Sequence, residues 1–96
     1  MAVTETVTLT HATMVFGDTD EAIITFMQDH PDEIAEMNTF VLDSLANGTV
    51  AQTEELVEGN NGVTITRQWT DESWAEWNGL NALTVTNGWS REHGTS

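Results

Sequence analysis

Arg67 is the residue whose type and position most strongly suggest a chemical role. It lies in the alternating run from Val63 to Trp69, on the same side as Ile65, in a chain that has only two Lys or Arg residues. One interpretation is a structural ion pair, in which the stem of Arg67 packs on tryptophan and its guanidinium binds a carboxylate from a helix. The other is capture of an anion at a sheet edge, through stacking and a fork of N–H donors. The first interpretation predicts that Arg67→Met is tolerated, provided that the carboxylate left behind reaches water.

Three tryptophans follow Arg67 closely, at Trp69, Trp74 and Trp77. Indoles bury large apolar areas, so we expect these rings either to fill the core under a short helix or to form a contact for a partner or ligand. His11 lies on the apolar side of an alternating run, where an imidazole accepts a hydrogen bond in a core or an interface. The candidate partner or ligand residues are therefore Arg67, Trp69, Trp74, Trp77 and His11.

No set of residues shows the spacing of a catalytic or metal site. The three histidines are far apart in the sequence: His11, His30 and His93. None of them has a second histidine at the spacing of a zinc site. Asp18, Asp20 and Glu21 form an acidic group, but the calcium-binding loop with its central Gly and distal Glu is absent, and helix capping accounts for these acids. We predict no catalytic residue, no metal and no cofactor.

Charge is the most unusual property of the chain. Sixteen Asp and Glu residues stand against two Arg and no Lys, which gives a net charge of −14 at pH 7. Such a surface repels phosphates and anionic lipids, so direct binding to nucleic acid or to a membrane is disfavoured. No apolar run approaches the ~18 residues of a membrane span. The charge suits a protein that stays soluble at high concentration or docks on a basic protein.

Hydrophobic periodicity and turn residues predict one domain. A strand is expected over 3–16, a helical region with a capping box over 18–46 that is broken at Pro31, an edge strand over 49–58, a hairpin turn over 59–62, a strand over 63–69, a helix over 70–80 and a strand over 82–89. This order, β-α(α)-β-β-α-β, predicts an α+β, ferredoxin-like domain over residues 1–90, with a four-stranded antiparallel sheet and its helices on one face. Residues 91–96 are predicted to be a polar C-terminal tail.

The helix-free face of such a sheet presents hydroxyl and amide side chains: Thr4, Thr6, Thr8, Thr10, Thr64, Thr66 and Gln68. This surface contains no general base and no group that activates a nucleophile. It can pack against a second sheet, so we expect a homo-oligomer, with the homodimer as its simplest form.

The stretch TRQWTDESWAEW contains a strand that ends in Trp69, an acidic turn and a helix with Trp74 and Trp77. It resembles the small dimeric α+β-barrel proteins of the antibiotic-biosynthesis-monooxygenase type. That resemblance implies two sheets packed face to face and a cavity for substrate or haem between sheet and helices, although no residue matches a catalytic motif of the family. The stretch is also similar to small uncharacterised proteins of marine tailed phages, which implies a role in the virion or in host takeover.

Three classes of function follow from these observations. We expect a small, acidic, self-associating structural or adaptor protein encoded by a phage, non-enzymatic, acting in the virion or in the cytoplasm of the host cell. The first alternative is a monooxygenase-like or ligand-binding dimer with a Trp-lined apolar cavity. The second is a nucleic-acid mimic whose carboxylates imitate phosphates on a basic protein.

Overall fold

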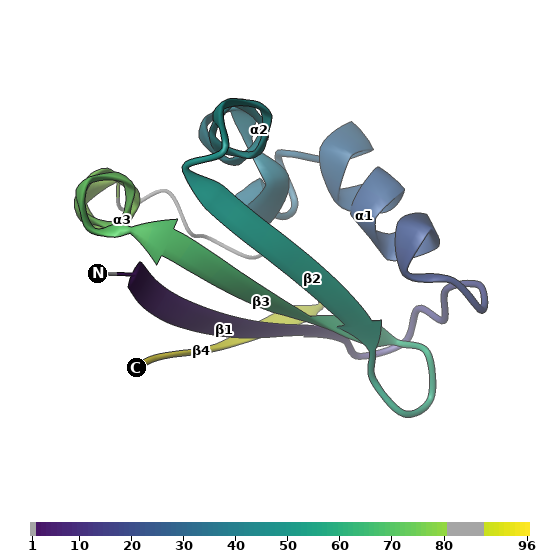
Figure 1. The fold of residues 1–96 in the computed structure, drawn as a ribbon. Coiled ribbons are helices and arrows are strands. Elements are labelled where there is room, and N and C mark those ends of the chain that lie inside the picture. The colour runs from purple at the N-terminus through teal and green to yellow at the C-terminus, as the bar shows by residue number, and fades with distance from the viewer. Residues whose placement is uncertain (1, 81–87) are drawn as a thin grey trace.

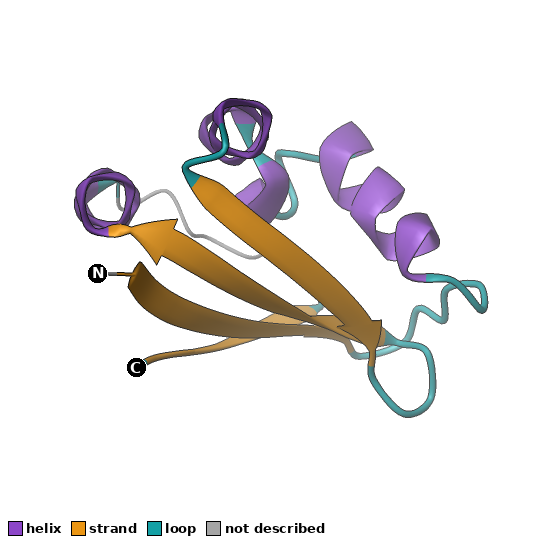
Figure 2. Ribbon diagram, in the orientation of Figure 1, coloured by secondary structure: helices purple, strands orange, loops and turns teal. Residues whose placement is uncertain are grey.

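The computed structural model describes residues 2–80 and 88–96. Along the chain they form β1 (Ala2–His11), α1 (Asp20–Asp29), the 3₁₀ helix η1 (Ala35–Met37), α2 (Thr39–Asn47), β2 (Val50–Leu56), β3 (Gly62–Thr70), α3 (Asp71–Gly79) and β4 (Trp89–Thr95). Figures 1 and 2 show the strands as one twisted sheet beside the helices. Among the described residues, none of the helices has the length and apolar character needed to cross a membrane.

The sheet has four strands in the order β2-β3-β1-β4, and every neighbouring pair is antiparallel. The predicted α+β class with a four-stranded antiparallel sheet is therefore confirmed. The placement of β2 at an edge of the sheet is confirmed as well. Its partner β3 lies against β1 in a register that sets Val7 opposite Ile65.

The alternation in β1 and β3 separates a core face from an open face. Val7, Leu9, Val63 and Ile65 are buried, and the same core includes residues of α1, η1, α2 and α3. Threonines occupy the other face, where the hydroxyls of Thr8 and Thr64 lie 3.3 Å apart across the strands. Residues that alternate along a strand point to opposite faces, which explains this division.

The helical region between β1 and β2 differs in detail from the expectation. Thr19 is the N-cap of α1 but makes no side-chain capping bond, so the predicted capping box does not form. The second helix was expected over 32–46, but the chain forms η1 and then begins α2 at Thr39. The reason is local: the side chain of Asn38 accepts a hydrogen bond from the Val41 amide and so starts a new helix there.

The turn between β2 and β3 follows its sequence. Gly59 and Asn60 have positive φ angles of 94° and 57°. Gly and Asn are the residues that adopt this conformation most readily, as tight hairpin turns require. Gly62 begins β3, and a Cβ built there would lie 2.1 Å from the Leu9 carbonyl oxygen, so no side chain fits.

The C-terminal prediction was wrong in one respect. The strand expected over 82–89 falls almost wholly outside the described residues, and only Gly88 and Trp89 of it are seen. The residues expected to form a polar tail instead belong to β4, in which Arg91 lies opposite Leu9 and His93 opposite Val7. Pairing with the free edge of β1 satisfies the backbone of this polar segment, so its low strand propensity is overridden.

Candidate functional site

Arg67 is fully buried at the centre of the core face and uses its whole guanidinium group. Its Nε donates to Gln52 Oε1 at 2.8 Å, and its Nη1 donates to Glu5 Oε1 at 3.2 Å and to Glu36 Oε2 at 2.8 Å. Its Nη2 donates to the Glu36 carbonyl oxygen at 2.8 Å. The side chain is therefore a structural ion-pair partner, with Glu5 supplied by β1 and Glu36 by η1.

Glu5 is fully buried and collects donors from three further elements. Its Oε1 accepts from the indole of Trp69 at 2.8 Å, and its Oε2 accepts from the indole of Trp77 at 2.9 Å. Nε2 of His93 lies 2.9 Å from the same Oε2. Burial alone acts to raise the pKa of Glu5, but the two indole hydrogen bonds and the charge of Arg67 outweigh it, so the pKa of this carboxyl lies below its usual value.

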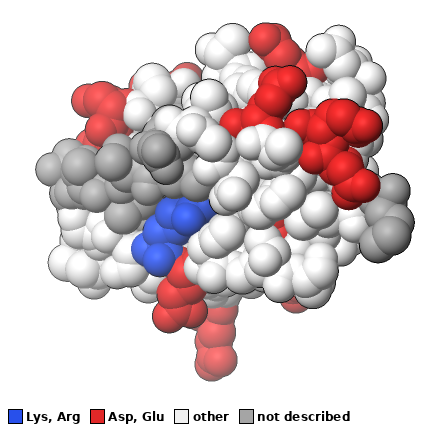
Figure 3. Space-filling model, turned by 90° about the vertical axis from the view of Figure 1, so that its left-hand side faces the viewer, with Lys and Arg blue, Asp and Glu red and all other residues white. Residues whose placement is uncertain are grey.

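Arg91 completes what we call the charge network: Glu5, Glu36, Arg67 and Arg91. Its Nε donates to Glu36 Oε1 at 2.6 Å, and its Nη2 lies 3.8 Å from Glu5 Oε2. The chain has only two Lys or Arg residues, so both of its permanent cations are committed to two buried carboxylates. Fourteen of the sixteen acidic residues remain outside the charge network. In Figure 3 the acids spread over the visible face, while the blue of Lys and Arg is one small patch.

The structure brings together only some of the predicted site residues. Arg67, Trp69 and Trp77 meet at Glu5 in the core, and Trp74 reaches this group only at its margin, where its ring stacks on His93 at 6.2 Å between centroids. His11 lies elsewhere: its Nδ1 accepts the backbone amides of residues 13 and 14 at 3.1 and 2.9 Å.

Sequence reasoning missed Glu5, Glu36, Arg91 and His93. Glu5 carried a readable signal, because it occupies the core-facing side of an alternating strand between Val3 and Val7. A buried carboxylate requires a partner, and the chain offers few cations. The others lie in an irregular segment or in the segment taken for a tail.

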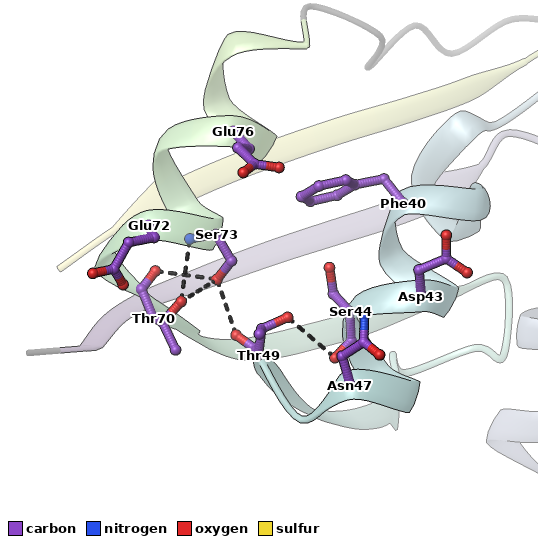
Figure 4. A pocket seen from close by; sticks show the side chains of 9 residues that line it. All are labelled: Phe40, Asp43, Ser44, Asn47, Thr49, Thr70, Glu72, Ser73 and Glu76. Carbon is purple, nitrogen blue, oxygen red and sulfur yellow. Dashed lines mark hydrogen bonds between the residues drawn. The ribbon is translucent and has the colours of Figure 1, made fainter.

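A separate cavity of about 470 Å³ opens between α2 and α3. Helix α2 lines it with Phe40, Asp43 and Ser44, and helix α3 with Glu72, Ser73 and Glu76. Figure 4 shows these side chains facing one another across the space. None of the lining residues is a tryptophan, so this is not the Trp-lined apolar cavity expected of a monooxygenase-like protein.

The two serines of the cavity differ in their hydrogen bonding. The Ser73 hydroxyl donates to the Thr49 carbonyl oxygen at 2.9 Å and lies 2.7 Å from the Thr70 hydroxyl. Ser44 is only 5% exposed and its hydroxyl points into the cavity, yet no hydrogen bond joins it to the other residues drawn in Figure 4. The cavity thus combines carboxylates, an aromatic ring and hydroxyl groups.

Comparisons with known proteins yield no relative. No family model, no curated protein and no solved structure matches this chain. The resemblances to dimeric α+β-barrel proteins and to phage proteins therefore stay predictions. Within residues 2–80 and 88–96, no group of three His, Asp or Glu side chains is placed to hold a metal ion.

Proposed function

We propose that the protein is a small acidic adaptor that binds a basic protein partner and associates with a second copy of itself. One observation supports this most directly. Both arginines are held by Glu5 and Glu36, so no Lys or Arg is left to balance the fourteen other acids. A surface with charge of one sign steers oppositely charged molecules toward it and raises their association rate.

The ferredoxin-like arrangement is part of the proposal. The strand order β2-β3-β1-β4 with antiparallel neighbours supports it, as does the position of the three α-helices on the same side of the sheet in Figure 1. This arrangement leaves the opposite face of the sheet without helical cover. The proposed contact for a second copy is this open face.

The charge of the open face favours that choice. Strand register places Thr, Ser, Gln, Ala and Gly residues on the open face. The acids on this face are Glu55 on β2 and Glu92 on β4. These two strands are the edges of the sheet, so the centre of the face, around Thr6 and Thr66, is uncharged. Two copies with a net charge of −14 each repel one another least where neither presents a carboxylate.

Light scattering at moderate ionic strength tests the self-association. We expect a mass near twice 10.6 kDa. Thr6→Glu with Thr66→Glu places two charges at the centre of the open face and should give a monomer. Thr25→Glu with Thr39→Glu adds the same charge at exposed helical positions and should leave the dimer intact. A monomeric wild-type protein would rule out the second copy as the occupant of this face.

The basic partner is tested by affinity capture with the native source, followed by titration of each captured protein in purified form. We expect a basic protein whose affinity falls steeply as salt increases, since screening weakens contacts between exposed charges. A partner that is itself a nucleic-acid-binding protein, and that DNA displaces, would favour the mimicry alternative. A partner whose affinity is indifferent to salt would contradict the electrostatic basis of the proposal.

A further inference from the structure

We infer that β4 is an edge strand that opens by itself: Trp89–Thr95 leaves β1 and returns while the rest of the domain stays folded. Release of β4 uncovers the outer edge of β1, where backbone groups can pair with an extended strand from another chain. Opening thus gives the molecule a second conformation, which the proposed binding of a basic partner does not require.

The packing of β4 against the rest of the molecule is slight. It stands at one end of the strand order, so among the described strands β1 is its single neighbour. Trp89 is the one buried residue of β4, and its ring lies 5.6 Å from that of Phe16 and 6.0 Å from that of Phe26, between centroids. Arg91 is half-buried and the other residues of the strand are exposed. Elements with so little buried apolar surface are the ones that open at low free energy.

The polar contacts of β4 are incomplete. Among the described residues, the buried side-chain nitrogen and oxygen atoms without a hydrogen bond are Trp89 Nε1 and Arg91 Nη2, and both belong to β4. Arg91 Nη2 lies 3.8 Å from Glu5 Oε2, which is too far for a hydrogen bond. A buried donor without an acceptor destabilises the state that buries it. Both donors reach water when β4 leaves, so opening recovers this free energy.

The carboxylates of the charge network keep a cation when β4 leaves with Arg91. Arg67 lies on β3, and its Nη1 is 3.2 Å from Glu5 Oε1 and 2.8 Å from Glu36 Oε2. Glu5 also keeps its two indole hydrogen bonds, whose donors lie on β3 and α3. Opening therefore leaves neither carboxylate without a counter-ion, and the other three strands and the helices can stay folded around them.

The backbone amides of β1 divide into two sets that report on different neighbours. Thr4 and Ser96 donate to each other's carbonyl oxygens at 3.2 and 2.9 Å. In an antiparallel ladder such reciprocal pairs recur at every second residue, and the residues between them bond to the strand on the other side. The β4-bonded set is therefore Thr6, Thr8 and Thr10. The β3-bonded set is Glu5, Val7 and Leu9.

Native-state hydrogen exchange of the full chain, followed by NMR, tests the inference. After correction for intrinsic rates, the β4-bonded set should exchange at least about tenfold faster than the β3-bonded set, because opening of β4 exposes the first set alone. The β4 amides that face β1, on Ser90, Glu92 and Gly94, should match the β4-bonded set, since all are released in one step. Equal protection of the two β1 sets would overturn the inference. A gradient of protection along β4 would also overturn it, because it would indicate fraying from the C-terminus.

Two substitutions separate opening of β4 from unfolding of the whole domain. Val50 is buried on β2, the strand farthest from β4. Val50→Ala should speed exchange of the β3-bonded set about tenfold and leave the β4-bonded set within about twofold, because its packing is lost only in global unfolding. Arg91→Gln removes a contact that is lost in both events, so it should speed both sets by the same factor, about tenfold. The inference fails if Val50→Ala speeds both sets alike, or if Arg91→Gln speeds the β3-bonded set alone.

Discussion

Arg67→Met should destabilise the protein strongly, contrary to what the sequence alone suggests. From the sequence alone, the substitution was expected to be tolerated if the carboxylate left without Arg67 could reach water. That condition is not met, because the exposed fractions of Glu5 and Glu36 are 0% and 1%. The methionine would preserve the packing of the stem against the indoles but leave buried negative charge without its main counter-ion.

The size of the effect follows from the contacts that remain. Loss of one partner from a buried ion pair costs ~3–5 kcal/mol. Glu36 would keep Arg91 Nε at 2.6 Å, and Glu5 would keep the indole donors of Trp69 and Trp77. We therefore expect the lower end of that range, about 3 kcal/mol. A chain of this length has a total stability of roughly 5–14 kcal/mol, so the variant should still fold.

Urea unfolding followed by tryptophan fluorescence measures this change. The control is the double variant Glu5→Gln/Arg67→Met, which neutralises Glu5, leaves Glu36 paired with Arg91, and keeps an amide oxygen as acceptor for an indole. We expect it to be more stable than Arg67→Met alone, with a coupling of roughly 1–3 kcal/mol between the two sites. An Arg67→Met variant within about 1 kcal/mol of the wild type would refute the reasoning, as would a double variant that is less stable than the single one.

Three further predictions concern other parts of the molecule. Gly62→Ala should lower the free energy of unfolding by about 2 kcal/mol or more, measured by thermal unfolding, because its Cβ would overlap the Leu9 carbonyl. The control Gly94→Ala, whose Cβ would have no atom within 4 Å, should lower it by less than about 1 kcal/mol. The pKa of Glu5 is lower in the folded protein than in the unfolded chain, so the unfolded chain binds a proton more readily. The contribution of Glu5 to the free energy of unfolding should therefore be complete above about pH 4.5 and be lost as the pH falls through the lower pKa of the folded state. In urea unfolding, Glu5→Gln should reduce the loss of stability at acid pH. The melting temperature should rise as NaCl increases from low to physiological concentration, because screening relieves repulsion among the fourteen acids outside the charge network, and a flat profile would contradict this.

Local patterns were sufficient to predict most of the sheet. The alternation of β3, the hairpin turn at Gly59 and Asn60 and the Thr70 cap of α3 appear where the sequence places them, because each depends on residues near one another in the chain. The first strand was predicted too long: it was expected over 3–16, but β1 ends at His11. The strand β4 could not be read in the same way. Its sequence from Trp89 to Thr95 is polar and has little β-branched character, and it becomes a strand only because β1 offers a free edge.

The charge network, too, could be predicted from the sequence only in part. Arg67 was correctly placed on the core face, and its neighbours Trp69 and Trp77 are buried with it. Its partners, however, are separated from it by 62 residues at Glu5 and by 31 at Glu36. Contacts of that separation depend on how the sheet closes and on where the irregular segment before α2 passes over it. Periodicity carries no information on either.

The charge network also connects stability to binding. It joins β1, β3, β4 and η1 through Glu5, Arg67, Arg91 and Glu36, so both cations serve to hold the closing strand and the helical layer together. No Lys or Arg outside the charge network is left to offset the repulsion among the surface acids. A cation that binds in the native state alone must raise the stability of the fold, since binding shifts the unfolding equilibrium. For this molecule a basic partner would act twice, once through its own contacts and once by relieving that repulsion, so the stability of the complex should exceed what the same contacts give to a neutral protein.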